Sequence, residues 1–285
     1  MRFVARHTTQ YHFSRPVFLE PHFIRLTPRQ DLTQRLVAFN LDIDPLPAGR
    51  FDGLDEEGNA CIQVWFDGFH DHLDISTHFE AITLRTNPFG FLLEKRSQCL
   101  PVALSAAQSA SLSACLTRAW ADSTASDELA HDIQGNVQSS LDFLLQLNMY
   151  LFEHLEKIER HEPGILSPRK VLSEKKGACR DTACVFVDCC RAVGIPARFV
   201  SGYQSGDPDV PYNELHAWAE VFLPGPGWLG FDPTHGLVAA DDHLALAASH
   251  DPMQAAPLLG TFRGTDAHST LTHQVVLERV EEGTF

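Results

Sequence analysis

The chain has 285 residues, 44% of them hydrophobic, and a formal net charge of −15 at neutral pH. This length is enough for one large or two ordinary domains, each with a proper hydrophobic core. The acidic balance argues against nucleic acid or an anionic membrane surface as a partner.

Three further features favour a cytoplasmic protein. The N-terminal stretch MRFVARHTTQYHF is charged and alternating, and it has no apolar block of the signal-peptide type. No apolar run approaches the roughly 20 residues of a membrane span. The seven cysteines are odd in number and irregularly spaced, which is typical of reduced thiols rather than of a disulfide framework. We therefore expect a cytoplasmic protein without membrane association.

Residues 1–95 have the pattern of short β-strands without helices. Polar and apolar side chains alternate in five stretches. The stretches are Arg2–Phe13, His22–Thr27, Leu36–Ile43, Cys61–Phe66 and Leu73–Arg85. In the last of them the apolar phase changes after Phe79, which predicts a bulge near Glu80. Strands of this kind predict an N-terminal domain, residues 1–95, that resembles a small antiparallel β-sandwich.

A change of composition marks the start of a second predicted domain, residues 96–285. It opens with a partly helical connector and a strong helix over Val137–Ile158. Ser167 and Pro168 form an N-cap and first-turn pair that opens a further short helix. Five apolar side chains of the strong helix recur at spacings of three and four, which predicts that they face the core. They are Leu141, Leu144, Leu145, Phe152 and Leu155.

The stretch Lys176–Tyr203 predicts a short turn, a buried helix and a strand. Gly177 is expected to give the turn its backbone freedom. The helix is predicted to begin near Cys179 and to end at Gly194, because glycine is a common left-handed cap and Pro196 cannot continue a helix. A cysteine on the first turn of a helix lies where unpaired N–H groups and the helix dipole favour its thiolate.

Two polar residues that could assist this cysteine follow in strand contexts. His216 begins an alternating strand in ELHAWAEVF, and Asp232 ends the next strand in WLGFD. A nucleophile at a helix N-terminus, with a base and an orienting group on adjacent strands, is the layout that a Cys/His/Asp acyl-transfer site requires. Each residue taken alone is more often an ordinary packing or polar residue, so it is their joint occurrence that favours catalysis.

The other potential metal ligands have simpler interpretations. Cys184, Cys189 and Cys190 lack CxxC spacing, and adjacent helical residues point about 100° apart, so we expect them to pack within the protein interior. His70 and His72 lie among aspartates in a predicted solvent-exposed hairpin. No metal and no cofactor is therefore expected.

Several motifs carry a family resemblance. GACRD, GIPARFVSGY, HAWAEVFLPGPGW and GFDPTHG occur in the second domain, and HTTQYHFSRPV and FIRLTPR occur in the first. Together they resemble the transglutaminase-like superfamily, in particular its bacterial two-domain members. The resemblance implies an α+β fold in which a papain-like core packs an antiparallel sheet on the helix of Cys179. It also implies that Cys179 is the nucleophile, His216 the base and Asp232 the residue that orients the histidine.

The implied activity is acyl transfer on a peptide or carboxamide bond of a protein or peptide substrate. The thiolate attacks the carbonyl carbon, His216 protonates the leaving amine, and a thioester remains. Water then gives hydrolysis and an amine gives transamidation, so the residues fit a protease, an amidase or a transglutaminase. The backbone N–H of Cys179 is expected to be one oxyanion donor. Departures from the bacterial pattern, which bear on the substrate, occur at Thr182, Cys184, Leu215 and Ser249–Pro252.

Two non-catalytic functions are the alternatives. A transglutaminase-like fold can serve as a protein-binding scaffold without activity, although the complete Cys/His/Asp set argues against this. The N-terminal strands could instead bind carbohydrate or protein, although residues 1–95 show neither an aromatic platform nor an acidic cluster.

Overall fold

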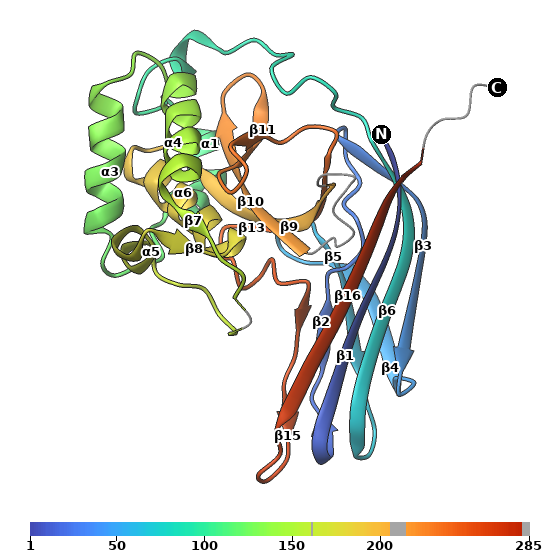
Figure 1. The fold of residues 1–285 in the computed structure, drawn as a ribbon. Coiled ribbons are helices and arrows are strands. Elements are labelled where there is room, and N and C mark those ends of the chain that lie inside the picture. Colours follow the sequence, from blue (N-terminus) through green and yellow to red (C-terminus); the bar gives the residue numbers. More distant parts are fainter. Residues whose placement is uncertain (161, 206–214, 281–285) are drawn as a thin grey trace, which may run out of the picture.

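The computed structural model describes residues 1–160, 162–205 and 215–280. Long strands form one part of the molecule, and helices packed on a curled antiparallel sheet form the other (Figure 1). The predicted α+β class is therefore confirmed. Among the described residues, no helix is long and apolar enough to cross a membrane.

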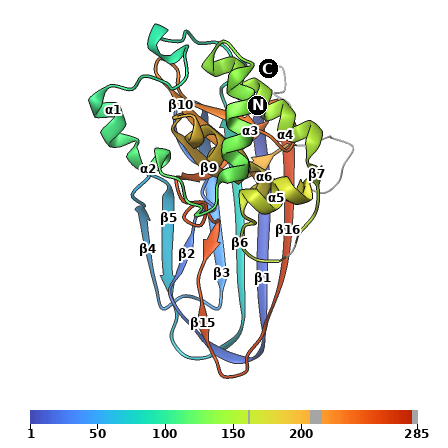
Figure 2. The ribbon, with the colours of Figure 1, turned by 90° about the vertical axis from the view of Figure 1, so that its left-hand side faces the viewer.

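Six strands precede residue 85, and they form two antiparallel sheets. They are β1 (Arg2–Leu19), β2 (His22–Ile24), β3 (Gln34–Asp44), β4 (Gly49–Leu54), β5 (Ala60–Trp65) and β6 (His70–Thr83). One sheet contains β1, β6 and β3, and the other contains β2, β5 and β4 (Figure 2). Phe3 and Phe79 from the first sheet share a buried core with Ile24 and Ile62 from the second. This arrangement is the sandwich that the alternating pattern predicts.

The bulge expected near Glu80 lies in the neighbouring strand instead. Burial alternates along β6 without interruption from Leu73 to Thr83, so this strand keeps its phase. The register shift falls in β3, between Leu36 and Ala38, and faces the Glu80 region of β6. The prediction assigned the irregularity to the wrong strand because Leu84, an apolar residue, is exposed beyond the end of β6.

The tail of the chain completes the same sandwich. Its strands are β14 (Leu258–Leu259), β15 (Phe262–Arg263) and β16 (Ser269–Val280). β16 pairs with β1 along nearly its whole length, and β14 pairs with β2. Val275 and Leu277 of β16 lie in the same core as Phe3. The division at residue 95 stays a prediction, but the tail strands join the sheets of the first 95 residues.

Helices fill the middle of the chain. They are the short 3-10 helix η1 (Lys95–Ser97), α1 (Ala106–Ser111), α2 (Ser113–Leu116), α3 (Thr124–Gly135), α4 (Ser140–His154), α5 (Pro168–Glu174) and α6 (Cys179–Ala192). Two short parallel strands, β7 (Glu156–Lys157) and β8 (Lys176–Gly177), lie before and after α5. Ser167 caps α5 through the N–H of Lys170, and Pro168 is its first residue, as predicted.

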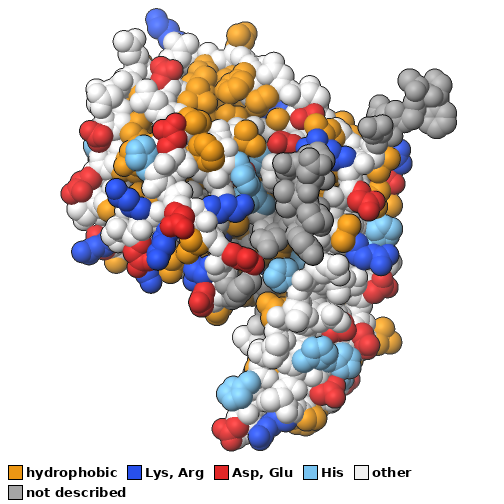
Figure 3. Space-filling view, viewed as in Figure 1, with side chains coloured by type: hydrophobic (Ala, Val, Ile, Leu, Met, Phe, Trp, Pro, Cys, Tyr) orange, Lys and Arg blue, Asp and Glu red, His pale blue; other side chains and the backbone are white. Residues whose placement is uncertain are grey.

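The buried face of α4 differs from the predicted one. Its fully buried apolar residues are Phe143, Leu144, Leu147 and Leu151. Of the five predicted core residues, Leu144 is among these, and Leu141, Leu145 and Leu155 pack at the margin of the core. Phe152 is 45% exposed, and its neighbours Met149 and Tyr150 are exposed at 40% and 37%. Hydrophobic side chains also gather on the upper part of the face shown in Figure 3.

A curled antiparallel sheet packs against α6. Its strands are β9 (Ala197–Gln204), β10 (Leu215–Leu223), β11 (Gly227–Asp232), β12 (Leu237–Val238) and β13 (His243–Ser249). Their order in the sheet is β12-β11-β10-β9-β13. Phe186 of α6 stacks on Phe231 of β11, with ring centroids 5.5 Å apart. Val221 of β10 belongs to the same core, so the predicted packing of the sheet on the cysteine helix is confirmed.

Candidate active site

Cys179 is the first residue of α6, as the sequence predicts. Gly194 follows the end of the helix with a φ of 77°, the left-handed conformation expected of a glycine cap. At the other end, Asp181 is fully buried and accepts the backbone N–H of Ala178 at 3.0 Å. Arg160 pairs with the Asp181 carboxylate at 3.1 Å. These contacts fix the first turn of α6 and therefore the position of Cys179.

Gly177 has a different role from the predicted one. It lies in β8, and it is not among the described glycines with a positive φ. A Cβ at this position would lie 3.1 Å from Cβ of Asp181 and 3.2 Å from Cγ1 of Val171. The glycine therefore allows close packing against the start of α6, and backbone freedom is not the reason for it.

Arg180 joins the segment before α5 to the start of α6. Its guanidinium donates to backbone carbonyls at 2.8–3.0 Å, and these belong to Arg160, Glu162 and Gly164. Ile165 of the same segment packs in a small cluster with Cys179. The segment is thereby held beside the thiol, and a positive charge lies close to it.

The antiparallel sheet brings the other candidate residues to one of its ends. His216 is near the start of β10, and Asp232 is the last residue of β11. Because β10 and β11 are antiparallel, the start of one lies beside the end of the other. By the same rule, the start of β13, where His243 lies, pairs with the end of β9. His216, Asp232 and His243 thus meet at one end of the sheet.

Cys179, His216 and Asp232 form one hydrogen-bonded chain. Nε2 of His216 lies 2.8 Å from Oδ2 of Asp232. The thiol of Cys179 is hydrogen-bonded to the His216 side chain. Since Nε2 is engaged by the carboxylate, Nδ1 is the ring nitrogen left for the thiol. The structure therefore brings together all three residues that the sequence pattern indicated.

Electrostatics in this chain favour a thiolate–imidazolium pair. Burial raises the pKa of the Cys179 thiol, but the hydrogen bond to His216, the charge of that ring, the N–H of Ala217 and the nearby Arg180 lower it below its ordinary value. Burial lowers the pKa of His216, but its bonds to Asp232 and Cys179 raise it to about 9. At neutral pH the imidazole is therefore protonated and the thiol is activated.

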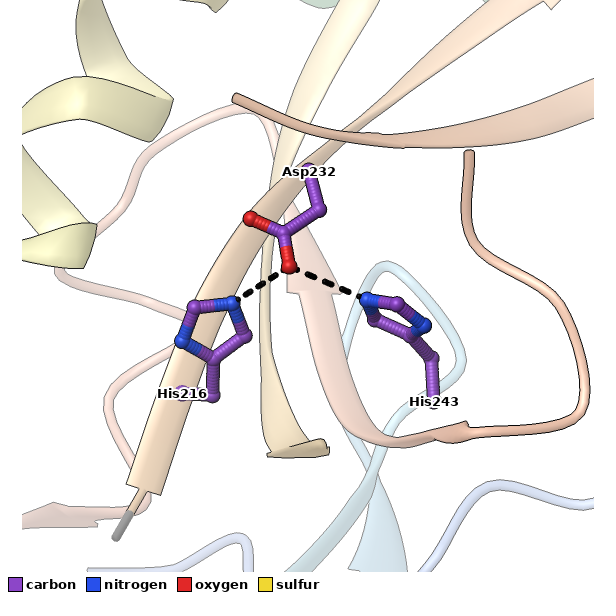
Figure 4. Close-up of side chains that lie close together, drawn as sticks. All are labelled: His216, Asp232 and His243. Atoms are coloured by element: carbon purple, nitrogen blue, oxygen red, sulfur yellow. Dashed lines mark hydrogen bonds and ion pairs between the residues drawn. The ribbon is translucent and has the colours of Figure 1, made fainter. Parts of the chain in front are cut away.

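Asp232 has partners that sequence reasoning missed. Its Oδ2 also accepts from Nδ1 of His235 at 2.9 Å. The same oxygen accepts from Nε2 of His243 at 3.1 Å (Figure 4). Burial raises the pKa of Asp232, but the hydrogen bonds from His216, His235 and His243 hold it well below its usual range. His235 belongs to the motif GFDPTHG. The residues after this motif gave no indication that His243 bonds to the same carboxylate.

The same residues raise the question of a metal site. His216, Asp232 and His243 each offer a ligand atom, and these atoms lie within 4.8 Å of one another. However, Oδ2 of Asp232 lies between the two ring nitrogens and is hydrogen-bonded to both (Figure 4). A nitrogen that donates to a carboxylate has no lone pair for a metal ion. The geometry is therefore that of a hydrogen-bonded cluster.

Trp218 contacts both histidine rings. Its ring lies nearly parallel to that of His216 at 6.1 Å and meets the ring of His243 edge-on at 5.2 Å. Gly202 makes room for it, because a Cβ there would lie 2.6 Å from Cη2 of Trp218 and 2.3 Å from the carbonyl oxygen of Leu244. The glycine of the SGY sequence thus lets the Trp218 ring and strand β13 pack closely against β9.

A cysteine at a helix N-terminus, packed against an antiparallel sheet that carries a histidine and an aspartate, is the arrangement of papain-like folds. Two family models match the chain. One, described as the transglutaminase-like superfamily, matches residues 127–233, and the other, the bacterial transglutaminase-like N-terminal region, matches residues 4–81. The chain belongs to the transglutaminase-like superfamily and carries the N-terminal region of its bacterial members.

Individual relatives agree with this assignment. A protein of Mycobacterium tuberculosis without an assigned function is 27% identical over 287 residues, which cover 95% of this chain and 90% of that protein. A protein-glutamine gamma-glutamyltransferase of Pseudomonas aeruginosa is 36% identical over 95 residues, which are 30% of this chain and 14% of that enzyme. A candidate cysteine protease from Cytophaga hutchinsonii has the same fold, with a TM-score of 0.76 at 19% identity, over 100% of this chain and 93% of that one.

Proposed function

We propose that the protein is a cysteine-dependent acyl-transfer enzyme that acts on peptide or carboxamide bonds through a thioester. The observation that carries this proposal is the continuous chain from the Cys179 thiol through His216 to the buried Asp232 carboxylate. The relative that is a protein-glutamine gamma-glutamyltransferase and the structural relative described as a candidate protease support the same class of chemistry.

The roles of the three residues follow from their protonation. The Cys179 thiolate attacks the carbonyl carbon, a sulfur–carbon bond forms, and the carbonyl oxygen becomes an oxyanion beside the N–H groups of the first turn of α6. His216 then gives its Nδ1 proton to the leaving amine as the carbon–nitrogen bond breaks. Asp232 keeps Nε2 protonated and the ring in place.

The second half-reaction decides between the candidate activities. Water or an amine attacks the thioester, His216 takes up the proton of the attacking group at Nδ1, and the thiolate leaves. Water releases an acid, as in a protease or an amidase. An amine releases a new amide, as in a transglutaminase. Adding a primary amine to the reaction and weighing the product distinguishes the two.

Trapping of the acyl-enzyme tests the proposal. Wild-type protein is incubated with a panel of activated acyl esters and peptide carboxamides, and its intact mass is measured. We expect one acyl adduct, which Cys179→Ala abolishes. The substitution removes little volume, so the cost in stability is about 1 kcal/mol and folding is retained.

Cys184→Ala is the matched control for this experiment. It alters a buried thiol of the same helix that does not contact His216 through any described hydrogen bond. The control should keep the adduct. An adduct that persists in Cys179→Ala would remove Cys179 as the nucleophile. No adduct from any probe on folded wild-type protein would favour the scaffold alternative.

A further inference from the structure

His243 and Asp242 form a second histidine–carboxylate pair, which is hydrogen-bonded to Asp232. Nε2 of His243 is 3.1 Å from Oδ2 of Asp232, and Nδ1 of His243 is 2.7 Å from Oδ1 of Asp242. The His243 side chain is 2% exposed. The mechanism proposed above uses neither His243 nor Asp242, although a buried histidine between two carboxylates is a costly arrangement that calls for an explanation.

The hydrogen bonds define the charge of His243. Burial raises the pKa of Asp242, but the hydrogen bond and charge of His243 lower it overall, and the pKa of Asp232 lies well below its usual range. An ionised carboxylate only accepts hydrogen bonds, so each ring nitrogen of His243 must carry a hydrogen. A histidine with both nitrogens protonated is a cation. Consistently, burial lowers the pKa of His243, but its bonds to Asp232 and Asp242 raise it overall.

The groups around His243 agree with this assignment. The titratable groups that face it are Asp232 from β11, Asp242 from the turn before β13, and His216 from β10, whose ring centroid is 6.4 Å away. His235 bonds to the same Asp232 oxygen, and its ring centroid lies 4.8 Å from that of His216. Gln204 of β9 faces His243 in the sheet and adds a hydrogen bond to Asp242. The two carboxylates thus offset the buried imidazolium.

We propose that His243, held as a cation by Asp242, is a positioning residue of this site. It fixes the Asp232 carboxylate and balances its charge, and it thereby sets the pH range in which Cys179 and His216 exist as an ion pair. This inference rests on the proposed roles of Cys179, His216 and Asp232. It adds His243 and Asp242 to the three site residues that the sequence motifs indicated.

The sign of the effect follows from the charges. Asp232 raises the pKa of His216, and a cation at His243 opposes that effect. At 6.4 Å and an effective dielectric constant of about 20, one charge shifts a pKa by about two units, and screening reduces this to about one. Without the cation, the His216 proton is held more tightly and the Cys179 thiolate loses a nearby positive charge. Both pKa values should therefore rise.

The experiment compares wild-type protein with His243→Gln, which keeps a hydrogen-bond donor but has no charge. The rate of iodoacetamide alkylation at Cys179 is followed from acid to alkaline pH by peptide mapping. The ring nitrogens of His216 are titrated by nitrogen-15 NMR. In the variant, the midpoint of His216 should rise by about one pH unit from its wild-type value near 9, and the midpoint of Cys179 should rise by a smaller amount. His131→Gln, an exposed histidine on α3, is the control and should leave both unchanged.

A second measurement does not depend on whether His243→Gln folds. Nitrogen-15 NMR of wild-type protein should show hydrogens on both ring nitrogens of His243 at neutral pH. In Asp242→Asn, the pH at which His243 loses its second proton should fall. A single protonated nitrogen on wild-type His243, or unchanged midpoints in folded His243→Gln, would overturn the inference. Failure of the proposed function gives a different result from failure of this inference, because Cys179 would then show no enhanced reactivity in wild-type protein.

Discussion

Asp232 accepts five hydrogen bonds, and they determine how the site is protonated. Three histidine ring nitrogens meet Oδ2, and the backbone N–H groups of Thr234 and His235 meet Oδ1. The side chain is fully buried. His235 is oriented in turn by Lys157, whose Nζ lies 3.4 Å from its Nε2. A carboxylate held in this way keeps the Nε2 hydrogen of His216 and leaves Nδ1 to Cys179.

Replacing this carboxylate by an amide should damage the site severely. In Asp232→Asn, an NH₂ group replaces one of the two carboxylate oxygens. Both oxygens accept hydrogen bonds from N–H groups, so the NH₂ group faces other donors and cannot accept from them. His216 can then adopt the tautomer that has no proton at Nε2, and we expect the rate of acyl transfer to fall by about 10²- to 10⁴-fold. The complete burial of Asp232 favours the larger loss. The rate is measured with the best acyl substrate from the trapping panel.

The control for this variant is Asp42→Asn, which alters an exposed carboxylate on β3. Its rate should match wild type. An unchanged rate in Asp232→Asn would reduce the site to a Cys179–His216 pair. Circular dichroism of the variant at the assay temperature separates loss of catalysis from loss of folding.

The sequence predicted some of these residues and missed others for a physical reason. Cys179, His216 and Asp232 each stand in a strong local context, a helix start or a strand end. His243 stands in a similar context at the start of β13, but β13 lies two strands away from β10 in the sheet. The curl of the sheet brings His243 to Asp232 although β13 and β11 are not neighbouring strands. Curl depends on long-range packing, which alternation along a strand does not encode.

At the scale of elements, strand β13 connects the sandwich to the five-stranded sheet of β9–β13. It is an edge strand, and two amide side chains from the sandwich pair with its free backbone groups. Gln34 exchanges two hydrogen bonds of 2.8 Å with the N–H and C=O of Ala245. Asn59 does the same with Ala248 at 2.9 Å. The N-terminal region thus covers the edge from which His243 reaches the site.

Removing one of these amides should destabilise the molecule. Asn59→Ala leaves the buried N–H and C=O of Ala248 without their partner, and Asn59 itself is 1% exposed. Each unpaired group costs about 1–3 kcal/mol, so the melting temperature should fall by several degrees. Asn40→Ala, which removes an exposed amide bonded to Asp42, should leave it unchanged. Equal melting temperatures for both variants would show that the paired contacts add nothing to stability.

The sequence predicted where a helix begins and ends more accurately than which of its faces is buried. The start of α6 at Cys179 and its glycine cap were predicted correctly. The buried side of α4 was not, because Leu residues recur around most of this helix and several apolar faces fit the spacing. Neighbouring elements then decide which face is buried, as they place Phe143 and Leu147 inside and Phe152 outside.

At the scale of the whole molecule, the sandwich and the five-stranded sheet of β9–β13 share a core. Tyr203 of β9 and Leu244 and Leu246 of β13 are buried among the apolar residues of the sandwich. The hydroxyl of Tyr203 lies 2.8 Å from Nδ1 of His7 in β1. The tail strand β16 returns to pair with β1. Alternation in the sequence predicted the strands of the first 95 residues, but pairing between the two ends of the chain depends on the packed fold and has no local signal.

Selective reactivity of Cys179 is the most direct test of the account, because the chain carries seven cysteines. Folded protein is labelled briefly with iodoacetamide at about pH 6 and mapped by peptide mass. An unperturbed thiol is only about 0.3% ionised there, so rapid labelling requires a stabilised thiolate. Cys99 is exposed and serves as the internal reference for accessibility. Burial raises the pKa values of Cys184, Cys189 and Cys190, which should not react.

We predict that Cys179 is labelled at least about tenfold faster than Cys99, and that His216→Ala abolishes this advantage because the thiolate loses its main partner. His131→Ala, which alters an exposed histidine remote from the site, should keep it. Preferential labelling of Cys61, Cys99 or Cys115, or a rate at Cys179 that is indifferent to His216, would contradict the ion pair on which the proposed enzyme depends.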